Sequence, residues 1–294
     1  MTTQAPLHPI RPFTRPILQS IRAKLIPTTP PINSLPAHTI VLSDDSGSSG
    51  KRRRPAESAV LIPLLNIGGE AHVLMEVRDK GMRVHAGEAS FPGGKADEDD
   101  PDLIRTALRE AQEELALPPD NVEILGRLKP EYSLGNRARV WPFVGFIHSN
   151  PIPTLSESTR SLRQPHPIEA TSEILSSLPT SRLIPSPTEV SAILPIPLSA
   201  LQTPSRLSTH YFRLDTSKPY HKIRCEDYVV LPNKDHSSPA PTVSASLLKD
   251  NETSSTADDF RGLEVWGLSG WFLNKLAERV GWCEMPPKGV MPED

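Results

Sequence analysis

Three glutamates within five positions are the residues of this chain best suited to chemistry. Glu110, Glu113 and Glu114 follow one another at helical spacing, and at about 100° per residue they lie on one side of a helix. Clustered carboxylates repel one another unless a cation joins them, and oxygen ligands suit a hard cation such as Mg²⁺. The spacing predicts a metal site on a helix, although the same glutamates could simply face water on an amphipathic surface helix.

A Gly-Gly pair stands shortly before this helix. Gly93 and Gly94 are expected to form a tight turn that brings the backbone close to a ligand, because neither residue carries a side chain. The carbonyl of Gly94 could then share the cation with the glutamates. Arg109 can pair with Glu113 one turn on, which makes it an organiser of the site. The chemistry predicted is metal-assisted hydrolysis, in which water attacks the phosphorus of a diphosphate.

The helix that carries the glutamates has an apolar back and an acidic loop before it. Asp99 or Asp100 is expected to cap the helix, with Pro101 at its first position. The acidic run 97–100 is interpreted as a cap and as favourable charge at the helix N-terminus, not as a second metal site. The buried stripe is predicted to consist of Ile104, Ala107, Leu108, Ala111 and Leu115.

Composition divides the chain into one folded domain and several segments with too few apolar residues to form a hydrophobic core. The 294 residues include 33 prolines, and only 37% of them are hydrophobic, which indicates a compact domain with inserts. We assign residues 1–57 to a Pro-rich, basic N-terminal extension and linker and residues 58–282 to the domain. Inserts are expected at 149–187 and 232–261, and residues 283–294 form a tail.

The first 43 residues contain no Asp or Glu. An acid-free, Arg-bearing start is typical of a mitochondrial transit peptide. The many prolines favour a different interpretation, an extension that ends in a short helix over 17–25 and packs on the domain.

Apolar patterns predict strands on both sides of the glutamate helix. Residues 59–67 and 71–78 are expected to form a hairpin around 68–70. A closing amphipathic helix is expected within 263–280, with Trp266 and Trp271 in the core. Further strands are expected at 122–128, 140–147, 192–197, 211–214 and 228–231.

Charge, apolar run length and cysteine content exclude several classes of protein. The net charge of -3 provides no basic field that would attract nucleic acid. No apolar run approaches the ~18–20 residues of a membrane span. Cys225 and Cys283 are too few for a disulfide framework and point to a reducing intracellular compartment.

The glutamate helix and its flanks resemble the Nudix hydrolase signature, G-x5-E-x7-R-E-U-x-E-E-x-G-U, where U is apolar. The R-E-U-x-E-E core matches in full over 109–114, and Leu117 is the final apolar residue. Two positions depart from the signature. Eight residues, not seven, separate the first acid, Asp100, from Arg109, and Ala116 replaces the last glycine. If that position needs left-handed geometry, alanine strains it by ~1 kcal/mol. Neither departure touches the metal carboxylates.

The stretch VRDKGMRVHAGEASFPGG, residues 77–94, is similar to the coenzyme A diphosphatase branch of that family. The likeness implies that Arg78 and Arg83 bind phosphate oxygens. It also implies that His85 donates to phosphate or braces the loop. Glu88 would be a further metal ligand or base, or would hold Arg83 by a salt bridge. Glu189 is a weaker candidate for another acid near the metals, and Phe91 and Pro92 are expected to be packing residues.

The resemblance implies a Nudix fold of the α/β class, with a mixed β-sheet sandwiched between helices. Glu110, Glu113 and Glu114, with Gly94, would hold Mg²⁺ or Mn²⁺. The enzyme would hydrolyse coenzyme A or acyl-CoA to 3′,5′-ADP and 4′-phosphopantetheine. The alternatives are another Nudix substrate, such as NADH or an oxidised dNTP, and a non-catalytic nucleotide-binding module.

The resemblance also bears on location. Members of the branch are often peroxisomal, which makes the peroxisome the expected location. The C-terminal residues 291–294 carry no SKL-type address, and the acid-free N-terminal segment keeps mitochondria as the alternative. The oligomeric state is left open.

Overall fold

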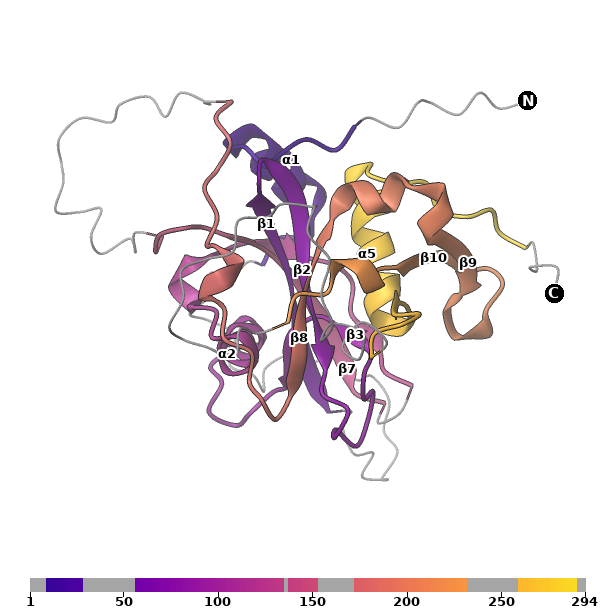
Figure 1. Cartoon of the computed structure of the whole chain (residues 1–294), viewed down its shortest axis with the longest axis horizontal. Coiled ribbons are helices and arrows are strands. Elements are labelled where there is room, and N and C mark those ends of the chain that lie inside the picture. The colour runs from indigo at the N-terminus through magenta and orange to yellow at the C-terminus, as the bar shows by residue number, and fades with distance from the viewer. Residues whose placement is uncertain (1–8, 29–55, 135–136, 153–171, 232–258, 290–294) are drawn as a thin grey trace, which may run out of the picture.

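A β-hairpin lies at the centre of the main sheet in the computed structural model, which describes residues 9–28, 56–134, 137–152, 172–231 and 259–289 (Figure 1). Its strands are β1 (Glu57–Ile67) and β2 (Glu70–Arg78), which pair antiparallel next to the turn. Gly68 and Gly69 make the turn with φ of 59° and 82°, which glycine adopts without steric strain. The predicted hairpin is confirmed.

The segment between β2 and the glutamate helix enters the open end of this hairpin. There β3 (Ala89–Ser90) pairs with β2, and β4 (Gly93–Lys95) pairs with β1. Gly93 and Gly94 therefore lie in a short strand, and the prediction of a tight Gly-Gly turn is wrong. The backbones of β4 and β1 approach closely here, so small residues are needed although the chain does not reverse.

Parallel pairing of β1 with β7 (Arg139–Ile147) makes the sheet mixed, as expected. The other strands of the sheet join its edges antiparallel. They are β5 (Val122–Arg127) and β6 (Glu131–Tyr132), which pair with β7, and β8 (Val190–Pro197), which pairs with β2.

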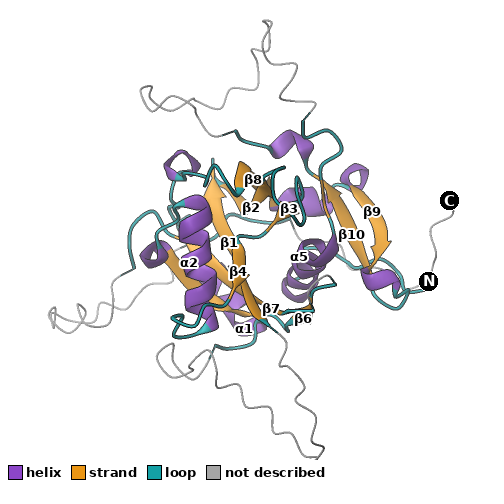
Figure 2. Ribbon diagram, turned by 90° about the horizontal axis from the view of Figure 1, so that it is seen from below, coloured by secondary structure: helices purple, strands orange, loops and turns teal. Residues whose placement is uncertain are grey.

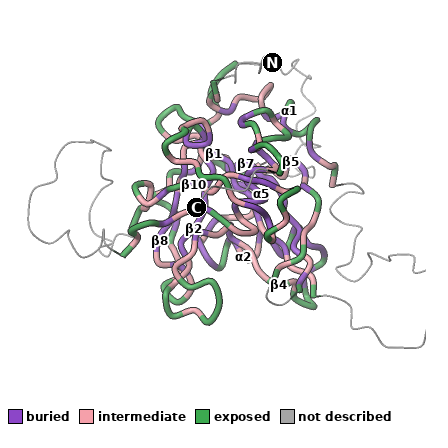
Figure 3. The backbone as a smooth tube through the Cα atoms, turned by 90° about the vertical axis from the view of Figure 1, so that its right-hand side faces the viewer, coloured by how far each residue is buried: buried purple, intermediate pink, exposed green. Residues whose placement is uncertain are grey.

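Helices cover both faces of the sheet (Figure 2). α2 (Leu103–Leu115) packs on one face, while α5 (Gly267–Val280) and α1 (Arg15–Lys24) pack on the other. Leu61 of β1 belongs to the core under α2, and Ile62 belongs to the core under α5. Burial on both faces explains why β1 is an almost continuous apolar run. The exposed segments lie mainly around the edge of the molecule, and the buried segments lie further inside (Figure 3).

A second, three-stranded sheet packs beside α5. It consists of β9 (Leu207–Tyr211), β10 (Pro219–Arg224) and β11 (Glu264–Val265), all antiparallel. Trp271 of α5 stacks on Phe212 with ring centroids 4.6 Å apart, so the core prediction is confirmed for Trp271. It is wrong for Trp266, whose exposed fraction is 43%. Trp266 is the N-cap residue of α5 and so precedes its buried stripe.

Two predicted strands are displaced. In most of 211–214 a short turn of 3₁₀ type, Phe212–Leu214, replaces the strand. The positive φ of Arg213 and Leu214 ends the extended chain there. In 228–231 the structure has the end of a 3₁₀ helix, Glu226–Tyr228, and an isolated bridge from Val230 to Ile193.

Part of the N-terminal extension belongs to the folded body. α1 confirms the predicted helix, and Phe13 just before it is fully buried. The backbone N–H of Phe13 donates to Oδ1 of Asn66 (2.8 Å), and Nδ2 of Asn66 donates to the carbonyl of Phe13 (2.9 Å). The extension and the domain therefore share one core.

Residues 172–187 are also folded, although an insert is predicted over 149–187. Leu178 and Leu183 are buried in the core under α2, so a segment rich in Pro and Ser supplies the few leucines that this core needs at its edge. The remaining parts of the two predicted inserts, 153–171 and 232–258, lie outside the described residues.

Phe91 and Pro92 are buried, as expected of packing residues. None of the helices in the described part of the chain has the length and apolar character that a bilayer crossing requires.

Candidate metal centre between α2 and the sheet

α2 begins and ends on specific local interactions. Oδ1 of Asp102 accepts a hydrogen bond from the backbone N–H of Arg105 (2.8 Å), so Asp102 is the N-cap. The prediction of Asp99 or Asp100 as the cap is wrong, and Pro101 precedes the helix. At the other end Ala116 has φ 54° and ψ 29°, the left-handed conformation that the resemblance suggested for this position.

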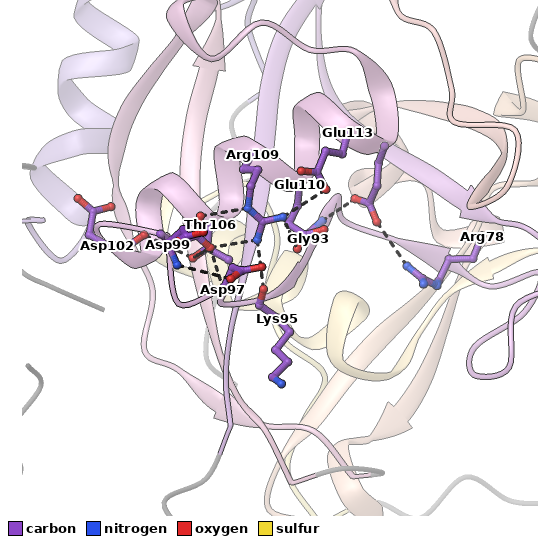
Figure 4. A network of polar contacts seen from close by, with 12 residues as sticks. Arg78, Gly93, Lys95, Asp97, Asp99, Asp102, Thr106, Arg109, Glu110 and Glu113 are labelled. Atoms are coloured by element: carbon purple, nitrogen blue, oxygen red, sulfur yellow. Dashed lines mark hydrogen bonds and ion pairs between the residues drawn. The ribbon is translucent and has the colours of Figure 1, made fainter. Parts of the chain in front are cut away.

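The arginine of α2 is held mainly by the acidic loop (Figure 4). Nε and Nη2 of Arg109 each donate to the carboxylate of Asp100 at 3.0 Å, and Nη2 also donates to the carbonyl of Lys95. Nη1 lies 3.0 Å from Glu110 and 3.2 Å from Glu113. The predicted pairing with Glu113 is present, but Asp100 is the principal partner.

Asp100 is buried and fully engaged. It also accepts from the hydroxyl of Thr106 (2.8 Å) and the backbone N–H of Asp97 (3.0 Å). Burial by itself raises the pKa of Asp100, but the hydrogen bonds from Arg109, Asp97 and Thr106 outweigh it and lower the pKa. Asp100 is therefore a carboxylate that fixes the arginine next to the glutamates.

The last glutamate of the triplet points into the protein. Glu114 is 2% exposed, and its Oε2 accepts a hydrogen bond from the backbone N–H of Gly93 (2.8 Å). Its Oε1 lies 3.7 Å from Nη1 of Arg78. α2, β4 and the end of β2 thus meet at this carboxylate.

A fourth glutamate, which the sequence analysis missed, lies beside it. Glu76 of β2 is fully buried, and its Oε1 accepts a hydrogen bond from Ser90 (3.2 Å) and lies 3.8 Å from Nη1 of Arg78. Its Oε2 is buried with no hydrogen-bond partner among the described residues. The same nitrogen of Arg78 therefore bridges Glu76 and Glu114. A glutamate inside an apolar strand was the signal available in the sequence.

The other two glutamates of α2 are more accessible. Glu110 lies against β4, where a Cβ added at Gly94 would come within 2.4 Å of its carboxyl group. The side chain of Glu113 is 59% exposed. Within the described residues, no three His, Cys, Asp or Glu side chains are gathered for metal coordination as they stand. The predicted ligands are Gly94, Glu110, Glu113 and Glu114. Their oxygen atoms could coordinate one cation together only after the glutamate side chains rotate.

The electrostatics of the cluster nevertheless suit a cation. Burial raises the pKa of Glu114, and the charge of Glu76 raises it further. Burial raises the pKa of Glu76 against the attraction of Arg78. Burial also raises the pKa of Glu110, although Arg109 opposes the shift, and Glu189 contributes negative charge to both Glu76 and Glu110. The pKa of each of these glutamates is raised because burial outweighs the attraction of Arg78 and Arg109. Buried carboxylates that are only partly offset by arginine, together with the unpaired oxygen of Glu76, suit a hard divalent cation.

The predicted substrate-binding residues lie on the loop after β2 but have different partners from those expected. Nδ1 of His85 lies 2.9 Å from Oε2 of Glu88, so Glu88 pairs with His85 and the expected salt bridge to Arg83 is absent. His85 has a φ of 60° and is exposed. Arg83 is exposed and makes no hydrogen bond or ion pair with the described residues, whereas Arg78 is engaged by the two buried glutamates.

Comparison with known proteins agrees with this architecture. Residues 55–170 match the sequence model of the family described as the NUDIX domain. This part of the chain is therefore similar in sequence to Nudix domains. The Nudix fold is the α/β arrangement described above, a mixed sheet with α2 on one face.

The chain is also similar to curated proteins. Over 116 residues the chain is 44% identical to an uncharacterized Nudix hydrolase NudL of Yersinia pestis (strain Pestoides F), and equally to that of Yersinia pseudotuberculosis serotype O:1b (strain IP 31758). Each match covers 40% of this chain and 56% of the relative, so the chain spans little more than half the length of these relatives.

Similar solved structures are distant. The NUDIX domain of Shewanella oneidensis NrtR complexed with ADP ribose has 15% identity and a TM-score of 0.33, over 50% of this chain and 75% of that one. A C. elegans Ap4A hydrolase binary complex has 16% identity and a TM-score of 0.32, over 49% and 81%.

Both departures from the Nudix signature have a structural explanation. The loop before α2 is one residue longer than the signature, yet Asp100 still reaches Arg109 with two hydrogen bonds. Ala116 occupies the left-handed position itself, where the Nudix signature has glycine. The first departure leaves the geometry intact, and the second adds local strain.

Proposed function

We propose that the Nudix domain hydrolyses the diphosphate bond of a nucleoside diphosphate derivative, and that coenzyme A or acyl-CoA is its substrate. The observation that carries the proposal is the group of carboxylates from α2 and β2 around the backbone of Gly93 and Gly94. Glu110, Glu114 and Glu76 are near one another, and burial raises the pKa of each. Such a group needs a cation, and a diphosphate brings negative charge that a cation neutralises.

Glu110, Glu113 and Glu114 would hold Mg²⁺ or Mn²⁺, together with the Gly94 carbonyl and the unpaired oxygen of Glu76. When bound, the cation supplies Lewis-acid charge neutralisation at the diphosphate and lowers the pKa of coordinated water. Asp100 keeps Arg109 in place, and Arg109 in turn orients Glu110 and Glu113. A carboxylate of the group accepts the proton of the attacking water.

The choice of coenzyme A is supported by the loop after β2. Arg83 is exposed and unpaired among the described residues, so its guanidinium is available to a phosphate group. The pair of His85 and Glu88 braces the loop that carries Arg83. Arg78 lies between Glu76 and Glu114, so a phosphate bound at this group of carboxylates would be close to its guanidinium.

Product identification tests the proposal. The full chain is incubated with Mg²⁺ and, separately, coenzyme A, NADH and 8-oxo-dGTP, and the products are identified by mass spectrometry. We expect 3′,5′-ADP and 4′-phosphopantetheine from coenzyme A as the fastest reaction. If coenzyme A is the poorest substrate, the substrate proposal is wrong. The variant Glu113→Gln is expected to abolish hydrolysis, while Glu98→Gln in the exposed part of the acidic loop should not. If none of the three compounds is hydrolysed, a non-catalytic nucleotide-binding module is the better interpretation.

A further inference from the structure

A small pocket lies where the loop after β2 meets the second sheet. Its volume is ≈ 200 Å³. Gly87 and Glu88 line it from the loop after β2, and residues 259–264 with Trp266 line it from the segment before α5. This volume is below the ~300 Å³ usual for a whole ligand, so the pocket suits one part of a larger molecule.

The pocket is adjacent to the carboxylate group. The carbonyl of Glu88 accepts a hydrogen bond from the backbone N–H of Arg78 (3.0 Å). Ser90, two residues after Glu88, donates to Glu76 (3.2 Å), and two residues of extended chain span at most about 7 Å. β11 also lies beside β3. One extended substrate can therefore reach the glutamates and the pocket together.

The wall formed by residues 260–267 is held by hydrogen bonds. The backbone N–H of Leu263 donates to Phe260 (3.0 Å), and the carbonyl of Leu263 accepts from Cys225 (3.0 Å). The N–H of Gly267 donates to the hydroxyl of Tyr220 (2.9 Å). The wall is thus fixed to the β10 region at Leu263 and at Gly267, so the pocket is formed before a ligand enters it.

The charges around the pocket are largely paired. Lys80 lies 2.6 Å from Asp259, and Lys222 lies 2.7 Å from Glu264. Glu88 is paired with His85. Arg261 is the exception, because it is exposed, lines the pocket and makes no ion pair with the described residues. The pocket therefore offers one unpaired cationic side chain.

Trp266 adds an aromatic surface. Its exposed fraction is 43%, whereas Trp141, Trp271 and Trp282 are buried. An indole left accessible next to an unpaired guanidinium is the combination that stacks on a nucleobase and binds a phosphate.

We propose that this pocket is a subsite for the nucleoside end of the substrate, with the base against Trp266 and a ribose-linked phosphate at Arg261. The inference rests on the proposed function, since it places one half of a nucleoside diphosphate derivative. The carboxylates that line the pocket accept hydrogen bonds from the exocyclic amine of adenine and from ribose hydroxyls. The other half of the substrate, pantetheine in coenzyme A, then extends from the metal site in a different direction.

Binding of the two product halves tests the subsite separately from catalysis. Titration calorimetry measures the Kd of 3′,5′-ADP and of 4′-phosphopantetheine for the full chain and for Trp266→Ala and Arg261→Ala. We expect each variant to bind 3′,5′-ADP about 5- to 150-fold more weakly, with 4′-phosphopantetheine unchanged. Trp266→Phe and Arg261→Lys should restore part of the affinity. Tyr132→Ala and Arg279→Ala remove an exposed aromatic ring and an exposed arginine outside the pocket and serve as matched controls.

Each outcome bears on one proposal. Unchanged 3′,5′-ADP affinity in both variants, or a loss confined to 4′-phosphopantetheine, overturns the subsite. Failure of the chain to hydrolyse coenzyme A, with 3′,5′-ADP binding still dependent on Trp266, overturns the proposed activity and leaves the subsite standing. Thermal melting of every variant separates loss of binding from loss of fold.

Discussion

Arg109 of α2 donates two hydrogen bonds of 3.0 Å to the carboxylate of Asp100, which lies in the acidic loop before the helix. Asp100 is the more buried partner, with a side chain 6% exposed against 30% for Arg109. Hydrogen bonding to Asp100 is the main reason that the pKa of Arg109 is raised further above its usual value. The pair connects the loop before α2 to the turn of the helix that carries Arg109 and Glu110.

Removing Asp100 should destabilise the domain and misplace the arginine. Asp100→Ala leaves the guanidinium of Arg109 and the hydroxyl of Thr106 without their shared acceptor, and we expect a loss of about 2–4 kcal/mol in the free energy of unfolding. Urea denaturation measures it. Asp99→Ala, an exposed neighbour in the same loop, is the matched control. Equal stability of the two variants would contradict the role given to Asp100.

The buried pair of Glu76 and Glu114 leads to a prediction about cation binding. Glu76→Gln keeps the shape of the side chain but removes its charge, so Mn²⁺ affinity should fall by about tenfold or more. Without divalent cations the same variant should melt at a higher temperature, because a buried charge with an unpaired oxygen has been removed. Mn²⁺ titration followed by electron paramagnetic resonance and thermal melting provide the two measurements.

Ser90→Ala is the control for Glu76→Gln, since it removes the hydrogen bond to Glu76 and leaves the charge. Mn²⁺ affinity equal to that of the unmodified chain in Glu76→Gln would show that Glu76 is not part of the metal centre.

Adjacent glycines of β4 should respond to alanine in opposite ways. A Cβ at Gly93 would lie 2.3 Å from the carbonyl oxygen of Ala59, and its φ of 153° is strained for alanine. The nearest clashing atoms belong to the backbone of β1, which cannot move aside without breaking the sheet. Gly93→Ala should therefore unfold at a much lower denaturant concentration than the unmodified chain. A Cβ at Gly94 would meet only the end of the flexible Glu110 side chain. Gly94→Ala should therefore stay folded and lose cation binding and hydrolysis.

Circular dichroism during denaturation and Mn²⁺ titration distinguish the two glycine variants. Equal loss of stability in both would mean that Glu110 cannot move away from position 94.

Ala116 gives a prediction of increased stability. Because its φ is 54°, replacement by glycine should relieve strain and stabilise the domain by about 1 kcal/mol. Gln112→Gly, in the interior of the same helix, should instead lower stability by about 1 kcal/mol. Chemical denaturation of both variants checks the signs, and a destabilised Ala116→Gly would show that alanine is unstrained there.

The lowered pKa of Glu123 leads to a prediction of how the free energy of unfolding depends on pH. Burial raises the pKa of Glu123, but His148, Arg15 and Arg22 outweigh burial and lower it from 4.5 to about 2. The stabilisation from Glu123 is therefore present above pH 4.5 and is lost as the pH falls toward 2. Glu123→Gln should cost about 1–3 kcal/mol at pH 7 and should weaken the acid dependence between pH 4.5 and 2.

Denaturant titrations of the full chain and of Glu123→Gln at pH 7, 4.5 and 3 test this prediction. Glu278→Gln, an exposed glutamate paired with Lys275, is the control. Glu123 lies 2.8 Å from Arg15 and 2.7 Å from Arg22 of α1. An acid dependence that is the same in both variants would mean that these ion pairs do not stabilise the fold.

Local patterns in the chain were sufficient to predict α2, the β1–β2 hairpin and the helix before the domain. Each depends on side chains close in sequence: the helical repeat of Ala107 and Ala111, the glycines at 68 and 69, and the apolar residues of α1. The motif around Arg109 likewise lies within one helix, so the resemblance to the Nudix signature and the prediction of a metal site both come from local spacing.

The assembly of the site depended on contacts between residues far apart in the chain. Glu76 and Glu114 are brought to one arginine because the segment of β3 and β4 enters the open end of the hairpin and α2 packs against β1 and β4. The same folding places Glu88 beside residues 259–266. Periodicity describes which face a residue occupies within its own element. Which faces meet is decided by the sheet pairing and core packing of the whole domain.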